Sequence, residues 1–128
     1  MSKFSNHLEN ALINATLRNI PYSSPSTVYV ALYTTDPTDS DTGNEVAGGS
    51  YARQVVTFTA PVNGETGNTA DVTFPVATAN WGTVTHIGLK DAASGGNLLY
   101  HSPLTSPRNI EINTQIIFLQ GEIKVTLL

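Results

Sequence analysis

The chain has 128 residues, of which 12% are charged, a formal net charge of −4 and no cysteine. This length accommodates one domain with a single core, and the lack of cysteine excludes a disulfide framework, a thiolate metal site and a thiol nucleophile. The six Lys and Arg residues form no basic cluster, and no apolar run approaches the roughly 20 residues that span a bilayer. We therefore expect no nucleic-acid partner and no membrane partner.

Most of the polarity comes from Thr, Asn and Ser rather than from charged side chains. Short polar side chains lose less entropy at a contact than Lys or Glu, so this composition favours packing against neighbouring molecules. Residues 1–19 lack the charged-then-apolar order of a secretion signal. The sequence thus predicts a soluble protein that is made in a cytoplasm.

The first periodic segment is Ser2–Asn19, where apolar residues recur at spacings of three and four and predict a helix. They are Phe4, Leu8, Ala11, Leu12 and Ala15. Ser2 or Ser5 can cap the first turn, and Pro21 cannot continue the helix. A second apolar track consists of Ile13, Leu17 and Ile20. Two interpretations stay open: a helix buried on its own domain, or a helix that shares its apolar surface with a partner.

A short Pro/Ser linker, Pro21–Ser26, precedes seven segments rich in β-branched and aromatic residues. These segments are Thr27–Thr34, Tyr51–Thr59, Thr69–Phe74, Thr83–Lys90, Asn97–His101, Thr114–Leu119 and Glu122–Leu127. The first is apolar on both faces, which predicts an internal strand, and Gln120-Gly121 predicts a closing hairpin between the last two. The fold class expected is mainly β: an antiparallel β-sandwich, Ig-like or jelly-roll-like, with an N-terminal α-helix. Residues 1–20 would form the helical segment and residues 21–128 the sandwich.

The segment Asp36–Gly49 is a long polar loop with several oxygen ligands of the kind that calcium prefers. Those ligands are Asp36, Asp39, Asp41 and Glu45. An EF-hand numbered from Asp39 would need Asp or Asn, Gly and Glu at three positions that instead hold Gly43, Asn44 and Ser50. We therefore expect a solvated loop and no metal.

No pattern in the chain indicates catalysis. The three histidines, His7, His86 and His101, have no zinc-ligand spacing, and no nucleophile elbow, phosphate-binding loop or motif for glycoside cleavage occurs. We expect no cofactor and no enzymatic activity. The single tryptophan, Trp81, is interpreted as a packing anchor of the core, with stacking on a sugar ring as the alternative.

Several segments in order resemble a family of tailed-bacteriophage virion proteins, described as tail-fibre-like or small head and tail structural proteins. They are the helix around Ser5–Ile13, VYVALYTTDPTD at Val28–Asp39, GGSYARQ at Gly48–Gln54, NTADVTFP at Asn68–Pro75, the long run Ala77–His101 and the closing strands. Each motif is short, but together they cover nearly the whole chain. The resemblance implies a non-enzymatic β-sandwich that is a component of the virion.

The resemblance leaves two functions open. A fibre module is normally fused to a longer fibrous chain, whereas this domain carries its own helix, which favours a capsid decoration (cement) protein that stabilises the head by multivalent contacts. The alternative is a tail or tail-fibre-associated module for host recognition or glycan binding, through Trp81, Tyr100 or Tyr51. Expected partners are further copies, in a homotrimer or dimer, and the major capsid protein or tail proteins. The candidate contact residues are Phe4, Leu8, Leu12, Asp36, Asp39 and Asp41.

Overall fold

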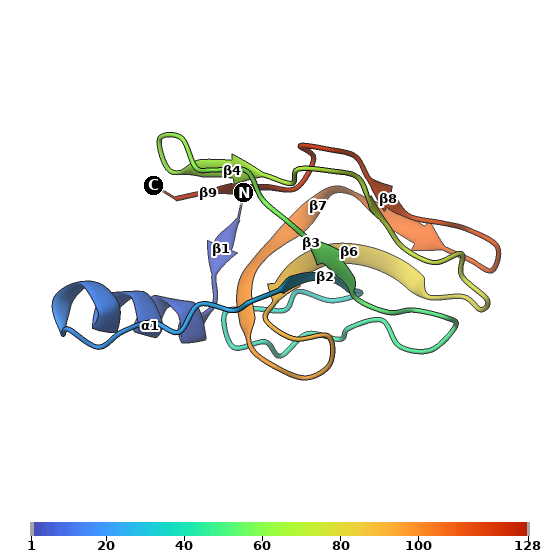
Figure 1. Cartoon of the computed structure of the whole chain (residues 1–128). Coiled ribbons are helices and arrows are strands. Elements are labelled where there is room, and N and C mark those ends of the chain that lie inside the picture. Colours follow the sequence, from blue (N-terminus) through green and yellow to red (C-terminus); the bar gives the residue numbers. More distant parts are fainter. Residues whose placement is uncertain (1, 128) are drawn as a thin grey trace.

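The structure is a computed structural model that describes residues 2–127, in which one helix and nine strands form two layers (Figure 1). The elements are β1 (Lys3–Phe4), α1 (Asn6–Leu17), β2 (Val28–Tyr33), β3 (Gln54–Val56), β4 (Glu65–Gly67), β5 (Val72–Thr73), β6 (Gly82–Lys90), β7 (Leu98–Ile110), β8 (Ile117–Phe118) and β9 (Lys124–Thr126). All strand pairs are antiparallel. The expected class, a mainly β sandwich with an N-terminal helix, is confirmed.

One layer is a five-stranded sheet in the order β1-β7-β6-β2-β3. β2 lies between two neighbours, as its two apolar faces predict, and its Leu32 is opposite Ile87 of β6. Val30 and Leu32 point into the core, whereas Tyr33, on the other side of the strand, lies under the loop that follows. Both faces of this sheet are therefore covered in its centre.

The other layer consists of two short strand pairs, β4 with β9 and β5 with β8, which lie above the five-stranded sheet in Figure 1. One apolar core fills the space between the layers. Its buried aromatic members are Trp81, Phe74 and Phe118, and Ile110 and Ile116 are among its aliphatic members. The N-terminal end of the chain meets this layer, because the backbone N–H of Thr126 donates to Ser2 Oγ at 3.1 Å.

The predicted closing hairpin is wrong. The turn itself forms: Gly121 has a φ of 81°, and the N–H of Glu122 donates a hydrogen bond to the carbonyl of Leu119 at 3.0 Å. Beyond this turn, however, β8 and β9 diverge. β8 pairs with β5 and β9 pairs with β4. The reason is Asn68, which is 2% exposed and binds both Leu119 and Ile123 through its side chain. This amide holds the turn open at the base of the second layer.

The N-terminal helix is shorter than predicted. It begins at Asn6 because Ser5 is its N-cap and accepts a hydrogen bond from the N–H of Leu8 at 3.1 Å. The prediction that Phe4 belongs to the helix is wrong, since β1 pairs Phe4 with Tyr100 at the edge of the sheet. The helix ends at Leu17, and Asn19 at φ 55° turns the chain before the proline.

The strand bounds differ most from the prediction in β7 and in the second layer. β7 continues through Pro103 and Pro107 to Ile110, with a register shift against β6 between Val84 and His86. Proline is tolerated there because it lacks the N–H that an inner strand needs, and this part of β7 lies at the edge of its sheet. β1 and β4 were not predicted at all.

Candidate functional surfaces

The loop between β2 and β3 is fixed to the outer face of the five-stranded sheet. Asp41 accepts a hydrogen bond from the hydroxyl of Tyr33 at 2.8 Å and forms an ion pair with Lys90, which is only 4% exposed. Burial, and then the hydrogen bond to Asp41, raise the pKa of Tyr33. A buried ammonium needs such a partner, so Asp41 is a structural anchor of the loop.

The other two predicted aspartates also face their own chain. Asp39 Oδ1 lies 2.7 Å from Nε2 of His101, which is 4% exposed, and Asp36 Oδ1 accepts the backbone N–H of Thr38 at 2.8 Å. That N–H lowers the pKa of Asp36. The loop is largely exposed to solvent, as expected, with the side chains of Asp36 and Asp39 54% and 46% exposed, and it is also held to the sheet through Asp39 and Asp41. Contact of these residues with another protein stays a prediction.

A second polar network closes the edge of the sheet beyond β3. Arg53 donates to both carboxylate oxygens of Glu45, at 2.8 and 2.7 Å, and Tyr51 donates to Glu45 at 2.6 Å. Burial opposes the ionisation of Glu45, but the hydrogen bonds from Arg53 and Tyr51 outweigh it and lower its pKa. Arg53 also binds the carbonyls of Ala92 and Gly95 at 2.8 Å. One guanidinium thus joins the connection between β2 and β3 to the loop between β6 and β7.

The polar atoms of these networks have their hydrogen-bond partners within the protein. Within residues 2–127, each buried side-chain nitrogen or oxygen has a hydrogen-bond partner, and no three His, Cys, Asp or Glu residues form a group that could hold a metal. What the networks do is hold loops on a rigid scaffold. Among the described residues, α1 falls short of the length and apolar character of a membrane-spanning helix.

The aromatic residues considered for glycan contact lie mostly inside the protein. Trp81 is 6% exposed, packs edge-on against Tyr51 with ring centroids 5.5 Å apart, and donates its indole N–H to the carbonyl of Gly49 at 2.8 Å. Gly49 sits at φ 58°, and a Cβ there would lie 2.9 Å from that indole nitrogen. The interpretation of Trp81 as a packing anchor is confirmed. Tyr51 and Tyr100 are each half-buried, and Tyr100 lies beside Phe4.

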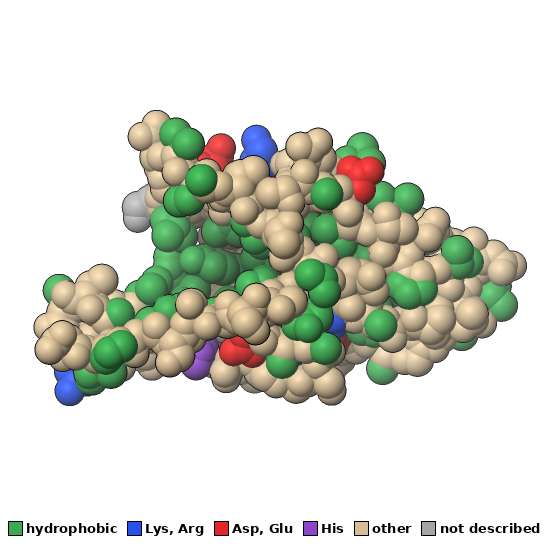
Figure 2. All heavy atoms as spheres, viewed as in Figure 1, with side chains coloured by type: hydrophobic (Ala, Val, Ile, Leu, Met, Phe, Trp, Pro, Cys, Tyr) green, Lys and Arg blue, Asp and Glu red, His purple; other side chains and the backbone are tan. Residues whose placement is uncertain are grey.

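α1 exposes its second apolar track, whereas the predicted contact residues Leu8 and Leu12 lie on the first. Leu8 is 3% exposed and Leu12 is half-buried, whereas Leu17 is 79% and Ile13 is 52% exposed. Figure 1 shows α1 extending away from the sheets, and Figure 2 shows hydrophobic side chains on its surface. The sequence already indicates this exposed surface through the second apolar track, which consists of Ile13, Leu17 and Ile20. Of the first track, the structure buries Leu8 and half-buries Ala11 and Leu12, whereas the second track is exposed.

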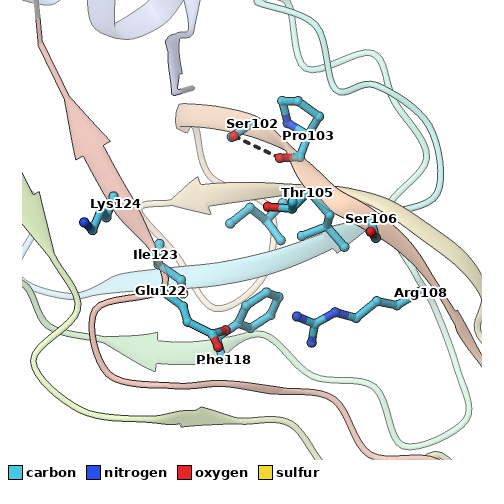
Figure 3. A pocket seen from close by; sticks show the side chains of 11 residues that line it. Ser102, Pro103, Thr105, Ser106, Arg108, Phe118, Glu122, Ile123 and Lys124 are labelled. Atoms are coloured by element: carbon cyan, nitrogen blue, oxygen red, sulfur yellow. Dashed lines mark hydrogen bonds between the residues drawn. The ribbon is translucent and has the colours of Figure 1, made fainter.

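A groove of about 540 Å³ lies between β7 and the segment that carries β8 and β9 (Figure 3). Its floor is apolar, with Phe118 and Ile123 buried and Ile87 and Leu104 half-buried, while Arg108 and Lys124 stand at its rim. The rest of the lining is mostly polar and includes Ser102, Thr105, Ser106 and Glu122. The guanidinium of Arg108 is held 5.2 Å above the centre of the Phe118 ring. Figure 2 shows a hollow lined with hydrophobic side chains between the β4/β9 pair and the end of the five-stranded sheet. The sandwich is therefore open on this side.

Comparison with known families decides what kind of protein carries this scaffold. A family model described as podophage GP4 fiber I protein gp80 matches residues 3–126. The chain belongs to this family. A comparison with curated proteins finds no match.

Membership of the gp80 family identifies the chain as a phage fibre structural protein, as the resemblance to tail-fibre-like virion proteins predicts. The family description supports a place in the virion, and it agrees with the tail-fibre alternative better than with capsid decoration. The match spans both layers of the sandwich as well as α1 and β1, so it refers to the whole fold described above.

Proposed function

We propose that this protein is a non-enzymatic component of the fibre apparatus of a tailed phage, in contact with tail proteins and with further copies of itself. The observation that carries the proposal is the match of the gp80 fibre family to residues 3–126. The structure supports it in two ways: the ionic networks lock the loops, and α1 offers apolar side chains outside the folded core. A rigid scaffold with an unpartnered helix suits an assembly component.

Capsid decoration, which the sequence favoured, is not the function that we propose. The family description names a fibre protein, and the argument for decoration was that the domain carries its own helix. A helix that projects from a sandwich suits attachment to a fibre as well as to a shell. The helix alone therefore does not favour the head.

The test is to locate the protein on intact particles. Immunogold labelling of purified virions, with an antibody against the recombinant chain, is expected to mark the tail fibres. Mass spectrometry of the same particles measures the copy number, and particles made without the gene are the control for the antibody. Label over the capsid shell would support decoration instead, and virions that lack the polypeptide would exclude both functions.

A further inference from the structure

We propose that α1 of one copy docks into the β7/β9 groove of a second copy. The docking stripe on α1 consists of Glu9, Ile13 and Leu17, and the groove is the one lined by Ile87, Leu104, Phe118 and Ile123. This inference depends on the geometry of the chain alone and not on where the protein sits on the particle.

The helix needs a partner surface that its own chain does not provide. Isolated helices of about 12 residues are marginally stable in water, and most helical stability in proteins comes from packing of an apolar face. α1 has 12 residues and buries only Leu8, while Leu17 is 79% exposed. Ile13 and Leu17 follow the i, i+4 spacing of helices that bind in grooves.

The chain cannot fill its groove with its own helix. Hydrogen bonds fix the start of α1, because the N–H of Ser5 binds the carbonyl of Leu99 at 2.9 Å and that of Asn6 binds Asp39 at 2.8 Å. The Ser5 hydroxyl adds a bond to the carbonyl of Leu98. From this anchor α1 extends away from both layers, and the groove lining contains none of its residues (Figure 1). A helix in the groove must come from another molecule.

The groove is built to accept side chains rather than a strand. β1 pairs with only Tyr100 and His101 of β7, so beyond them this edge of β7 has no neighbouring strand in the described part of the chain. Pro103 and Pro107 follow on this edge and have no N–H for a further strand. On the other wall, Lys124 is an exposed charged residue of β9. Both walls therefore resist strand addition, while Ile87 and Leu104 stay half-buried against the core.

Charge also matches the helix to the groove. Glu9 is the only Asp, Glu, Lys or Arg between Asn6 and Leu17, and it lies on the same helix face as Ile13 and Leu17. The rim carries two cations, Arg108 and Lys124, against the one carboxylate of Glu122. The docking face of the helix is thus negative and the rim is net positive, which favours this pairing.

The contact area indicates a closed assembly in which each copy gives one helix and receives one. A 12-residue helix is about 18 Å long and about 10 Å wide, so one contact covers on the order of 200 Å² on each partner. One such contact is far below the roughly 1,000 Å² of a specific interface, whereas two reciprocal contacts reach about 800 Å² in total. This is the range of weak interfaces, so we expect association at micromolar concentrations, strengthened where a particle holds copies close together.

Sedimentation velocity of the full chain, at roughly 1 to 100 µM, tests the assembly. The wild type is expected to associate with rising concentration, and Ile13→Ser with Leu17→Ser is expected to weaken this at least tenfold. The matched control is Val62→Ser with Ile112→Ser, since these side chains are 69% and 55% exposed on other segments. Far-UV circular dichroism confirms that each variant is folded. A monomeric wild type at the highest concentration, or equal loss in the control, would overturn the proposal.

Disulfide trapping tests the docking geometry, because the chain has no cysteine of its own. A Leu17→Cys variant mixed with a Leu104→Cys variant is expected to form a mixed disulfide at least tenfold faster than Val62→Cys mixed with Leu104→Cys. Such trapping places the helix of one copy in the groove of another. Equal rates in the two mixtures would sink the docking mode even if the protein proves to be a fibre component.

Discussion

Arg53 illustrates how single side chains hold the loops of this sandwich. Its guanidinium forms a two-point ion pair with Glu45 and also binds two carbonyls of the loop after β6. The side chain of Arg53 is 8% exposed and that of Glu45 is 24% exposed, so little water replaces a lost partner. Removing one member therefore leaves the other charge desolvated and unpaired.

We expect Arg53→Ala to lower the free energy of unfolding by about 3 kcal/mol, because Glu45 loses its ionic partner in a half-buried position. Urea denaturation at neutral pH measures the loss. The control is Arg18→Ala at the exposed end of α1, which should change stability by at most about 0.5 kcal/mol. A loss in Arg53→Ala no larger than in this control would show that the network is not structural.

Acid should destabilise the fold through the same carboxylate. The pKa of Glu45 is lower in the folded protein than in the unfolded chain. At acid pH the folded state therefore binds fewer protons than the unfolded state does. The stability that Glu45 contributes is present above about pH 4.3 and is lost below it. Urea titrations from neutral to acid pH should show this decline, with a shallower slope in Glu45→Gln. Some slope remains, because the pKa values of Asp36 and Asp91 are lowered too. An unchanged slope would contradict the role of Glu45.

Partners of single residues could not be predicted from the sequence. Asp41 and Lys90 are 49 positions apart, and the loop that unites them has no periodic pattern. Nothing in the sequence around Asn68 indicates that its buried amide binds Ala70, Leu119 and Ile123. Oxygen ligands in a loop are compatible with solvent, with a metal or with ion pairs to the sheet. Only the three-dimensional contacts separate these cases.

At the scale of elements, α1 is the piece whose position depends on the fewest contacts. Ser5 caps the helix and also ties it to β7 through the carbonyl of Leu98. Leu8 is the only buried residue of α1, so its direction is set by this leucine and by the hydrogen bonds of Ser5 and Asn6 at its start. The orientation of the exposed part of the helix therefore depends on the contacts at its N-terminal end.

We expect Ser5→Ala to loosen α1 without unfolding the sandwich, at a cost of about 1–2 kcal/mol for the lost cap. Hydrogen exchange should show faster exchange of the amides of residues 6–17 and unchanged protection in β2 and β6. Ser23→Ala in the exposed linker is the control, since the described contacts give this hydroxyl no hydrogen bond. Equal exchange of the α1 amides in wild type and Ser5→Ala would mean that the cap does not stabilise the helix.

The elements that the sequence predicts well are those whose own pattern of apolar and polar residues indicates which faces are buried. β2 and β6 have apolar residues on both faces or a clear alternation, and their positions agree with the prediction. The second layer was predicted poorly because its strands are only two or three residues long and pair across large sequence distances. In the closing segment, a correct turn at Gly121 led to a wrong pairing, since a local signal cannot specify a distant partner.

At the scale of the whole molecule, both layers share one core, so they should unfold together. Trp81 lies in that core, while circular dichroism reports on all the strands. We expect the denaturation curves from Trp81 fluorescence and from far-UV circular dichroism to coincide. Because most pairings join distant segments, refolding should be slow for this size, in milliseconds to seconds. Two separate transitions would instead indicate that the β4/β9 and β5/β8 pairs fold on their own.

The hydrogen bond between Thr126 and Ser2 Oγ brings the two ends of the described chain side by side. A short Gly/Ser peptide could therefore join them, and new ends could be opened in the exposed segment 93–97 without crossing the core. Such a circular permutant would move a genetically encoded label or a cargo peptide from the β4/β9 layer to the loop beside the start of α1, where Gly96 and Asn97 lie next to Asn6 and His7. The scaffold thus lends itself to displaying foreign sequences at either of two places.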